Sequence, residues 1–235
     1  MEIDISIIIM NDNIIEVKNI YKSFNTGKVK VDVLKNISID IKRGDFLSIM
    51  GPSGSGKSTF LYLLGGLDTP TKGTITIDNI NFYSLNDKEQ SRMRRQKIGF
   101  IFQFYNLIPN YTVEDNVLLP IILDNKKSSQ YKERLDELLN IVGLYDKKKY
   151  VPSELSGGQQ QRVAIARALI NNPEIIFADE PIGNLDSVTG EGIMELLSKI
   201  NKEFNNTIIQ VTHSRESANY GKSLINLKDG EIIEL

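Results

Sequence analysis

Apolar and polar residues alternate along the first part of the chain. Alternation over 14–22 and again over 33–41, with Asn25-Thr26-Gly27-Lys28 between them, predicts two strands joined by a turn. A largely apolar run then follows at 46–50 and is typical of a buried strand. The first two strands are expected to form an antiparallel flap beside the candidate binding site that follows this run and is described below.

Helical and strand-like segments alternate through the rest of the chain. Periodicity and capping signals predict helices over 57–67, over 86–96, after Thr112, after Ser128, over 160–170 and over 187–204. Short apolar runs predict strands over 74–77, 98–102, 174–180, 207–212, 223–228 and 231–235. This order predicts an α/β fold with a parallel-sheet core and antiparallel strands at both ends of the chain.

The chain's 235 residues allow one large domain or two small ones. We expect a single domain over 14–235 with a mostly helical subdomain at about 104–158. Residues 1–13 are treated as an N-terminal extension, in which the apolar stretch at 5–10 is either an edge strand or a result of start-site choice.

Composition and charge limit the kinds of partner and of binding site that this protein can have. The chain has 28 basic and 30 acidic residues and a formal net charge of −2, so we expect no nucleic-acid partner. It has no cysteine, which excludes disulfides and thiolate metal sites, and His213 is its single histidine. No apolar run approaches the roughly 20 residues that span a bilayer, and we expect a soluble, cytoplasmic protein.

The stretch 51–59 matches the phosphate-binding loop pattern GxxxxGK[ST]. Its residues are Gly51, Pro52, Ser53, Gly54, Ser55, Gly56, Lys57, Ser58 and Thr59. The glycines let backbone N–H groups point inward, Lys57 supplies a charge for the outer phosphates, and Ser58 offers a hydroxyl to magnesium. A glycine-rich surface turn is the alternative, but the strand before the motif and the apolar stretch 60–64 after it favour a nucleoside triphosphate site.

Other candidate residues stand at the ends of predicted strands. Asp179 suits a direct or second-shell magnesium position, and Glu180 beside it can polarise the attacking water. Gln103 can sense magnesium or water, and His213 can contact the γ-phosphate. Phe24 is a candidate platform for the adenine ring. Each also has an ordinary alternative as a structural, core or surface residue.

The order of these motifs resembles the nucleotide-binding subunit of an ATP-binding-cassette (ABC) transporter from about residue 14 to residue 235. The motifs are GPSGSGKST, FQ, LSGGQQQR, IIFADEP, NLD and a strand that ends in histidine. The resemblance implies a P-loop NTPase fold with an antiparallel β subdomain and a helical subdomain. It also implies ATP and Mg²⁺ as ligands and an ATP-dependent homodimer that holds two nucleotides head to tail.

The resemblance also implies roles for particular residues. Gln103 is then the Q-loop glutamine and a magnesium contact, Glu180 the catalytic carboxylate and His213 the switch histidine. Asp186 is the D-loop residue. The LSGGQ motif is implied to contact the γ-phosphate of an ATP on the other subunit through Ser156, Gly157, Gly158 and Gln159.

The exact sequences of four segments, GPSGSGKST, GFIFQ, NLIP and ADEPIGNLDS, are similar to those of the MacB/LolD/FtsE branch of that family. This similarity implies an FtsX-like membrane permease as partner, export of an antimicrobial peptide, lipid or lipoprotein, and a position on the inner face of the cell membrane. Two residues depart from the pattern of the branch, because Phe24 stands where tyrosine is usual and Ile182 where threonine is usual.

Two other functions fit parts of the sequence. A regulatory ATPase that signals through a membrane partner without transport would share every motif. A soluble ABC protein of DNA repair or translation is disfavoured, because the chain has neither a long heptad insertion nor a second cassette.

Overall fold

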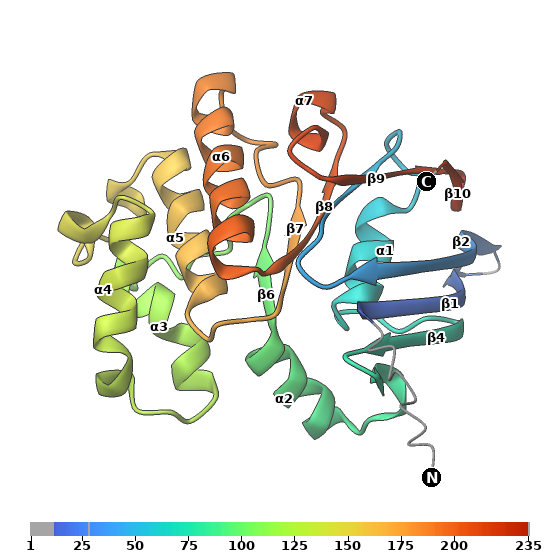
Figure 1. Cartoon of the computed structure of the whole chain (residues 1–235), viewed down its shortest axis with the longest axis horizontal. Helices are drawn as coiled ribbons and strands as arrows, with labels where there is room; N and C mark the ends of the chain where they lie inside the picture. Colours follow the sequence, from blue (N-terminus) through green and yellow to red (C-terminus); the bar gives the residue numbers. More distant parts are fainter. Residues whose placement is uncertain (1–11, 28, 235) are drawn as a thin grey trace, which may run out of the picture.

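The computed structural model describes residues 12–27 and 29–234, and its elements form two sheets and a group of helices (Figure 1). The apolar stretch at 5–10 lies outside the described residues. Figure 1 shows α3, α4, α5 and α6 gathered on one side of the central strands, with the antiparallel strands on the other side.

The antiparallel sheet has four strands in the order β2-β1-β4-β5. They are β1 (Asn13–Thr26), β2 (Val29–Lys42), β4 (Lys72–Ile77) and β5 (Ile80–Asn81). The β1–β2 hairpin confirms the predicted flap, although both strands are longer than the alternation predicted. Irregularities in the β1–β2 register, such as the shift between Val17 and Ile20, explain why the alternation is not continuous.

The second sheet has six strands in the order β10-β9-β3-β8-β7-β6. They are β3 (Phe46–Met50), β6 (Ile98–Ile101), β7 (Ile175–Asp179), β8 (Thr207–Thr212), β9 (Ser223–Lys228) and β10 (Glu231–Glu234). All neighbours are parallel except β9 and β10, which form an antiparallel hairpin at the edge. The parallel-sheet core is therefore confirmed.

Helices cover both faces of the parallel sheet. They are α1 (Lys57–Leu64), α2 (Asp87–Lys97), α3 (Val113–Leu123), α4 (Lys132–Ile141), α5 (Gly157–Leu169), α6 (Ser187–Phe204) and α7 (Arg215–Ala218). Short 3₁₀ turns lie at Phe82–Ser84, Ser128–Tyr131, Tyr145–Lys147 and Pro152–Glu154. The helices α3 and α4 lie within the predicted helical subdomain, whose limits at about 104–158 stay a prediction.

Strand β7 separates two hydrophobic cores. Because side chains of a strand point alternately to its two faces, Ile176 and Ala178 join the core that contains α3 to α6. Ile175 and Phe177 join the core that contains α1 and the antiparallel sheet. All four side chains are buried, so the end of β7 at Asp179 is fixed between the two cores.

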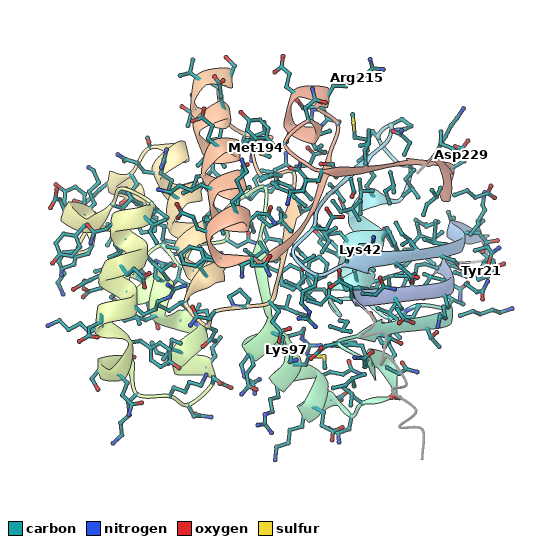
Figure 2. The ribbon with its side chains drawn as sticks, viewed as in Figure 1. Tyr21, Lys42, Lys97, Met194, Arg215 and Asp229 are labelled. Atoms are coloured by element: carbon teal, nitrogen blue, oxygen red, sulfur yellow. The ribbon has the colours of Figure 1, made fainter. Side chains whose placement is uncertain are left out.

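Two basic residues near the end of α2 form ion pairs with other elements. Lys97, labelled in Figure 2 at the end of α2, forms ion pairs with Asp78 and with Glu174. Arg95 pairs with Asp124 at 3.0 Å. These pairs tie α2 to the β4–β5 turn, to the start of β7 and to the end of α3.

Candidate functional site

The phosphate-binding loop connects β3 to the N-terminus of α1. Gly54 and Gly56 have φ angles of 80° and 98°, in the left-handed region that favours glycine. A Cβ on Gly56 would lie 2.8 Å from Leu34 Cδ2 of the antiparallel sheet. The loop is therefore packed closely under this sheet, and its backbone can turn towards a bound anion.

The side chain of Lys57 lies against the backbone of the phosphate-binding loop. Its side chain is largely buried, and its ammonium group donates to the carbonyl oxygens of Gly51 at 2.8 Å and Pro52 at 3.0 Å. The hydroxyl of Ser55 is also buried and has no hydrogen-bond partner among the described residues. A buried charge at a helix N-terminus and an unpaired hydroxyl both suit a phosphate group.

Asp179 at the end of β7 accepts two hydrogen bonds from α1. Ser58 Oγ donates to Asp179 Oδ1 at 2.9 Å, and the Tyr62 hydroxyl donates to Oδ2 at 2.6 Å. Burial, and then the hydrogen bond to Asp179, raise the pKa of Tyr62 to about 12, so its hydroxyl keeps its proton. The sequence interpretation did not include Tyr62, although its spacing of four residues from Ser58 places both on one helix face.

Ser58 and Asp179 form a donor set that fits Mg²⁺. This ion prefers oxygen ligands and is usually held by one or two carboxylates together with substrate phosphates. The described residues contain no group of three or more histidine, cysteine or acidic side chains that could hold a metal alone. A metal at this position would therefore depend on phosphate oxygens as well as on Ser58 and Asp179.

Glu180 and His213 are in direct contact. Glu180 Oε1 lies 3.0 Å from His213 Nδ1, and the two side chains are 15% and 70% exposed. Glu180 has a φ angle of 46°, which is uncommon for glutamate, and its N–H donates to the carbonyl of Val211 on β8. Because β7 and β8 are adjacent and parallel, the acid and the histidine meet at one edge of the sheet. The sequence placed both at strand ends but did not predict this contact.

Gln103 is paired with a residue that the sequence interpretation did not include. The Asn184 amide donates to the Gln103 carbonyl at 2.9 Å, and the Gln103 amide donates to Asn184 Oδ1 at 3.4 Å. Asn184 lies in the quoted NLD motif, which was the available signal. A role of Gln103 at magnesium stays a prediction.

The two residues that follow Phe104 adopt left-handed backbone angles. Tyr105 and Asn106 have φ of 59° and 48°. Arg167 on α5 donates to both of their carbonyl oxygens, and burial lowers its pKa to about 10. The partly buried arginine therefore fixes the path of the chain after Gln103.

The LSGGQ and NLD motifs begin two neighbouring helices. Ser156 caps α5, because the Gln159 N–H donates to Ser156 Oγ. Asp186 caps α6, and the hydrogen bonds from Thr189 hold the pKa of Asp186 below its usual value. A Cβ on Gly158 would lie 2.3 Å from Thr189 Cγ2, so the two helix starts are closely packed. No hydrogen bond within the described structure joins either of them to the phosphate-binding loop.

Phe24 lies near the end of β1 and is 42% exposed. The ammonium of Lys22 lies 4.6 Å from the centre of this ring and is fixed by Asp68 and by the carbonyl of Thr69. The exposed aromatic surface is compatible with base stacking. The role of Phe24 as the adenine platform stays a prediction.

A cavity of about 350 Å³ lies between α2 and β6 on one side and α3 and α5 on the other. The apolar residues that line it include Leu67, Phe100, Phe102, Leu119 and Leu123. Of the segment 104–111, Asn106 lines the cavity. Phe104 is 72% exposed and lies in the chain between the lining residues Phe102 and Asn106, and Leu107 packs against the helical core. None of the described helices is long and apolar enough to cross a membrane.

A family model described as ABC transporter matches residues 34–183. Over 222 residues the chain is 50% identical to MJ0796, an ABC transporter ATP-binding protein of Methanocaldococcus jannaschii, covering 93% of this chain and 94% of that one. The solved dimeric structure of MJ0796 matches with a TM-score of 0.86 at 49% identity, covering 94% of this chain and 97% of that one. A second dimeric structure of MJ0796, bound to ADP and Pi, matches equally well, with a TM-score of 0.86.

Two further relatives are named for export or release. The chain is 50% identical over 222 residues to the macrolide export ATP-binding/permease protein MacB of Mannheimia succiniciproducens, covering 94% of this chain but only 34% of MacB. It is 42% identical over 223 residues to the lipoprotein-releasing system ATP-binding protein LolD of Legionella pneumophila, covering 95% of this chain and 98% of LolD.

Proposed function

This chain belongs to the ABC transporter family as an ATP-binding subunit and an ATPase, and from this premise we propose that ATP closes two copies of it to drive a membrane permease. The observation that carries the proposal is the pair of contacts at one edge of the sheet, Ser58 to Asp179 and Glu180 to His213. One contact suits a metal–phosphate site and the other suits activation of water.

Each residue of this edge has a distinct task in the proposed reaction. Lys57 and the loop amides bind the outer phosphates, while Ser58 and Asp179 hold Mg²⁺, which neutralises phosphate charge when it is bound. Glu180 orients the attacking water and accepts its proton, and His213 holds the Glu180 carboxylate in place. The contact that the structure shows for Gln103 is with Asn184, so Gln103 would act beside the metal rather than as its main ligand.

The second half of each ATP site comes from another copy of the chain. Ser156, Gly157, Gly158 and Gln159 at the start of α5 would donate to the γ-phosphate of the partner's ATP, with Asp186 beside them. A helix N-terminus with free amide groups suits this task. The two dimeric structures of MJ0796 support the arrangement, because one of them carries ADP and Pi.

The proposed partner is an FtsX-like permease that holds the protein on the inner face of the cell membrane. MacB and LolD support this, since one is named as an ATP-binding/permease protein and the other as part of a lipoprotein-releasing system. The apolar cavity beside Phe104 is the proposed contact surface. The cargo class is an antimicrobial peptide, lipid or lipoprotein, and regulation through the permease without transport is the second candidate.

Measurement of phosphate release with ATP and Mg²⁺ tests the ATPase site. We expect Glu180→Gln to lower the rate by at least a hundredfold, on the order of the 10²–10⁴-fold contribution of general base catalysis, while nucleotide binding persists. Wild-type turnover in Glu180→Gln would refute the assignment. Co-purification with the permease, and cargo movement in vesicles that contain both proteins, then separate transport from regulation.

A further inference from the structure

The two hydrogen bonds on Asp179 come from neighbouring turns of one helix, but only one donor belongs to the phosphate-binding motif. Ser58 is a motif residue and bonds to Oδ1, whereas Tyr62 lies outside the motif and bonds to Oδ2. We propose that Tyr62 is a positioning residue for Mg²⁺, because its hydroxyl fixes Asp179 with the other carboxylate oxygen beside Ser58. This inference rests on the proposed function, in which Ser58 and Asp179 hold the metal.

The burial of Asp179 makes the second donor necessary. The residue is only 9% exposed, so little water can reach its carboxylate. A buried carboxylate oxygen without a donor costs about 1–3 kcal/mol or more, because charged groups lose the most hydration. If the Tyr62 hydroxyl were absent, Oδ2 would lose its protein donor and the carboxylate would be free to rotate towards other donors.

The hydroxyl of Tyr62 leaves the metal side of the carboxylate untouched. It occupies Oδ2 at 2.6 Å, while Oδ1 faces Ser58 at 2.9 Å. Partners that orient a metal ligand in this way typically change metal affinity by about 10–100-fold when they are removed. The expected effect of losing the hydroxyl is therefore on metal binding rather than on the phosphate-binding loop.

A purely structural role for the Tyr62 hydroxyl fits the structure less well. Tyr62 is only partly buried. The end of α1 is already held by a hydrogen bond from another tyrosine, Tyr83. The Tyr83 hydroxyl has one proton to donate and lies 2.5 Å from the carbonyl oxygen of Leu63 and 2.6 Å from that of Asp68. Tyr83 therefore provides a matched control, since its hydroxyl contacts the same helix and does not touch Asp179.

The experiment compares Tyr62→Phe with Tyr83→Phe, each of which deletes one oxygen. ADP affinity is measured in EDTA, and Mn²⁺ binding to the ADP complex is measured by electron paramagnetic resonance. Tyr62→Phe should weaken Mn²⁺ binding about tenfold and leave ADP affinity in EDTA unchanged. Tyr83→Phe should leave both affinities at the wild-type value, whatever it does to the melting temperature.

Three results would overturn the inference. Wild-type Mn²⁺ affinity in Tyr62→Phe would show that the hydroxyl does not position the carboxylate. An equal loss of ADP affinity in EDTA would show a structural role in the loop. Equal loss of Mn²⁺ affinity in Tyr83→Phe would show a general effect of loosening α1. Failure of the wild-type chain to bind ADP at all would instead refute the proposed function.

Discussion

Asp179 and Glu180 are neighbours in the chain but are held in different ways. Asp179 is the last residue of β7 and accepts from the neutral hydroxyls of Ser58 and Tyr62. Glu180 leaves the strand with a left-handed backbone and contacts His213. Strained backbone angles of this kind cluster at functional sites. The turn directs the two carboxylates to different partners, which suits one for a metal and the other for water.

At the residue scale, Lys57→Ala should abolish measurable ATP hydrolysis and weaken ATP binding by at least tenfold. The reason is that the Lys57 ammonium is the charge that the structure places over the carbonyls of Gly51 and Pro52. Fluorescence titration with a labelled nucleotide and a phosphate-release assay measure the two effects. Near-normal hydrolysis would move the nucleotide site away from this loop.

Substitutions at Phe24 test whether its ring stacks on the adenine of ATP. Phe24→Tyr should retain ATP affinity, and Phe24→Ala should lose about 1–3 kcal/mol of binding free energy, as base–aromatic stacking does elsewhere. Tyr21→Ala is the matched control, because it removes a similarly exposed aromatic ring from the same strand, 37% against 42%. The platform lies elsewhere if both alanine variants bind ATP equally well.

The elements that the sequence predicted best are those with strong signals at both ends. Helix α6 and strand β8 have the predicted limits, 187–204 and 207–212, because Asp186 caps the helix and left-handed Asn205 ends it. Helix α5 begins three residues earlier than predicted, because Ser156 caps it and the two glycines form its first turn. The short elements α7 and β5 were missed, since four and two residues carry no periodic pattern.

Local sequence signals also identify only part of the candidate site. Motif spacing identifies Lys57 and Ser58 because one continuous loop contains both. It does not identify Tyr62 or Asn184, whose partners Asp179 and Gln103 lie far away in the chain and are brought near only by strand order. Contacts of this kind depend on tertiary packing and cannot be predicted from local pattern.

The cavity between α2, β6, α3 and α5 gives a prediction at the element scale. Leu123 lines it and is 61% exposed, so Leu123→Glu should place a charge on the proposed contact surface for the permease. Permease-stimulated ATPase activity should then fall about tenfold, which corresponds to about 1.4 kcal/mol. The activity of the isolated chain should not change. Phe104→Glu should act in the same direction.

Ile233→Glu on β10 is the control for this prediction, because Ile233 is 62% exposed and belongs to the opposite edge of the sheet. Stimulation by the permease should survive in this variant. If all three glutamate variants are stimulated alike, the cavity is not the contact surface.

At the scale of the whole molecule, the proposed dimer places two halves of different ATP sites on one copy of the chain. The phosphate-binding loop lies between β3 and α1, whereas LSGGQ and the Asp186 segment begin α5 and α6. No hydrogen bond between the described residues connects these halves. In the proposed dimer a second copy completes each site, and ATP would join the two copies through its phosphate oxygens.

We predict that Glu180→Gln is monomeric or weakly self-associating without nucleotide and forms a dimer in ATP. The substitution keeps the shape of the side chain but removes the carboxylate that activates water in the proposed reaction. The γ-phosphate should then persist and the closed dimer should accumulate. Size-exclusion chromatography with light scattering, in ATP and then in ADP, measures the change.

Adding Ser156→Arg to Glu180→Gln should abolish the dimer without loss of ATP binding, because the arginine blocks only the half-site that faces the partner. Thr112→Arg is the matched control, since Thr112 caps α3 with the same type of capping box and lies outside both half-sites. Loss of a cap costs about 1 kcal/mol in either variant, so stability cannot explain a difference between them. A dimer that survives Ser156→Arg, or is lost equally in Thr112→Arg, would contradict a site shared between two chains.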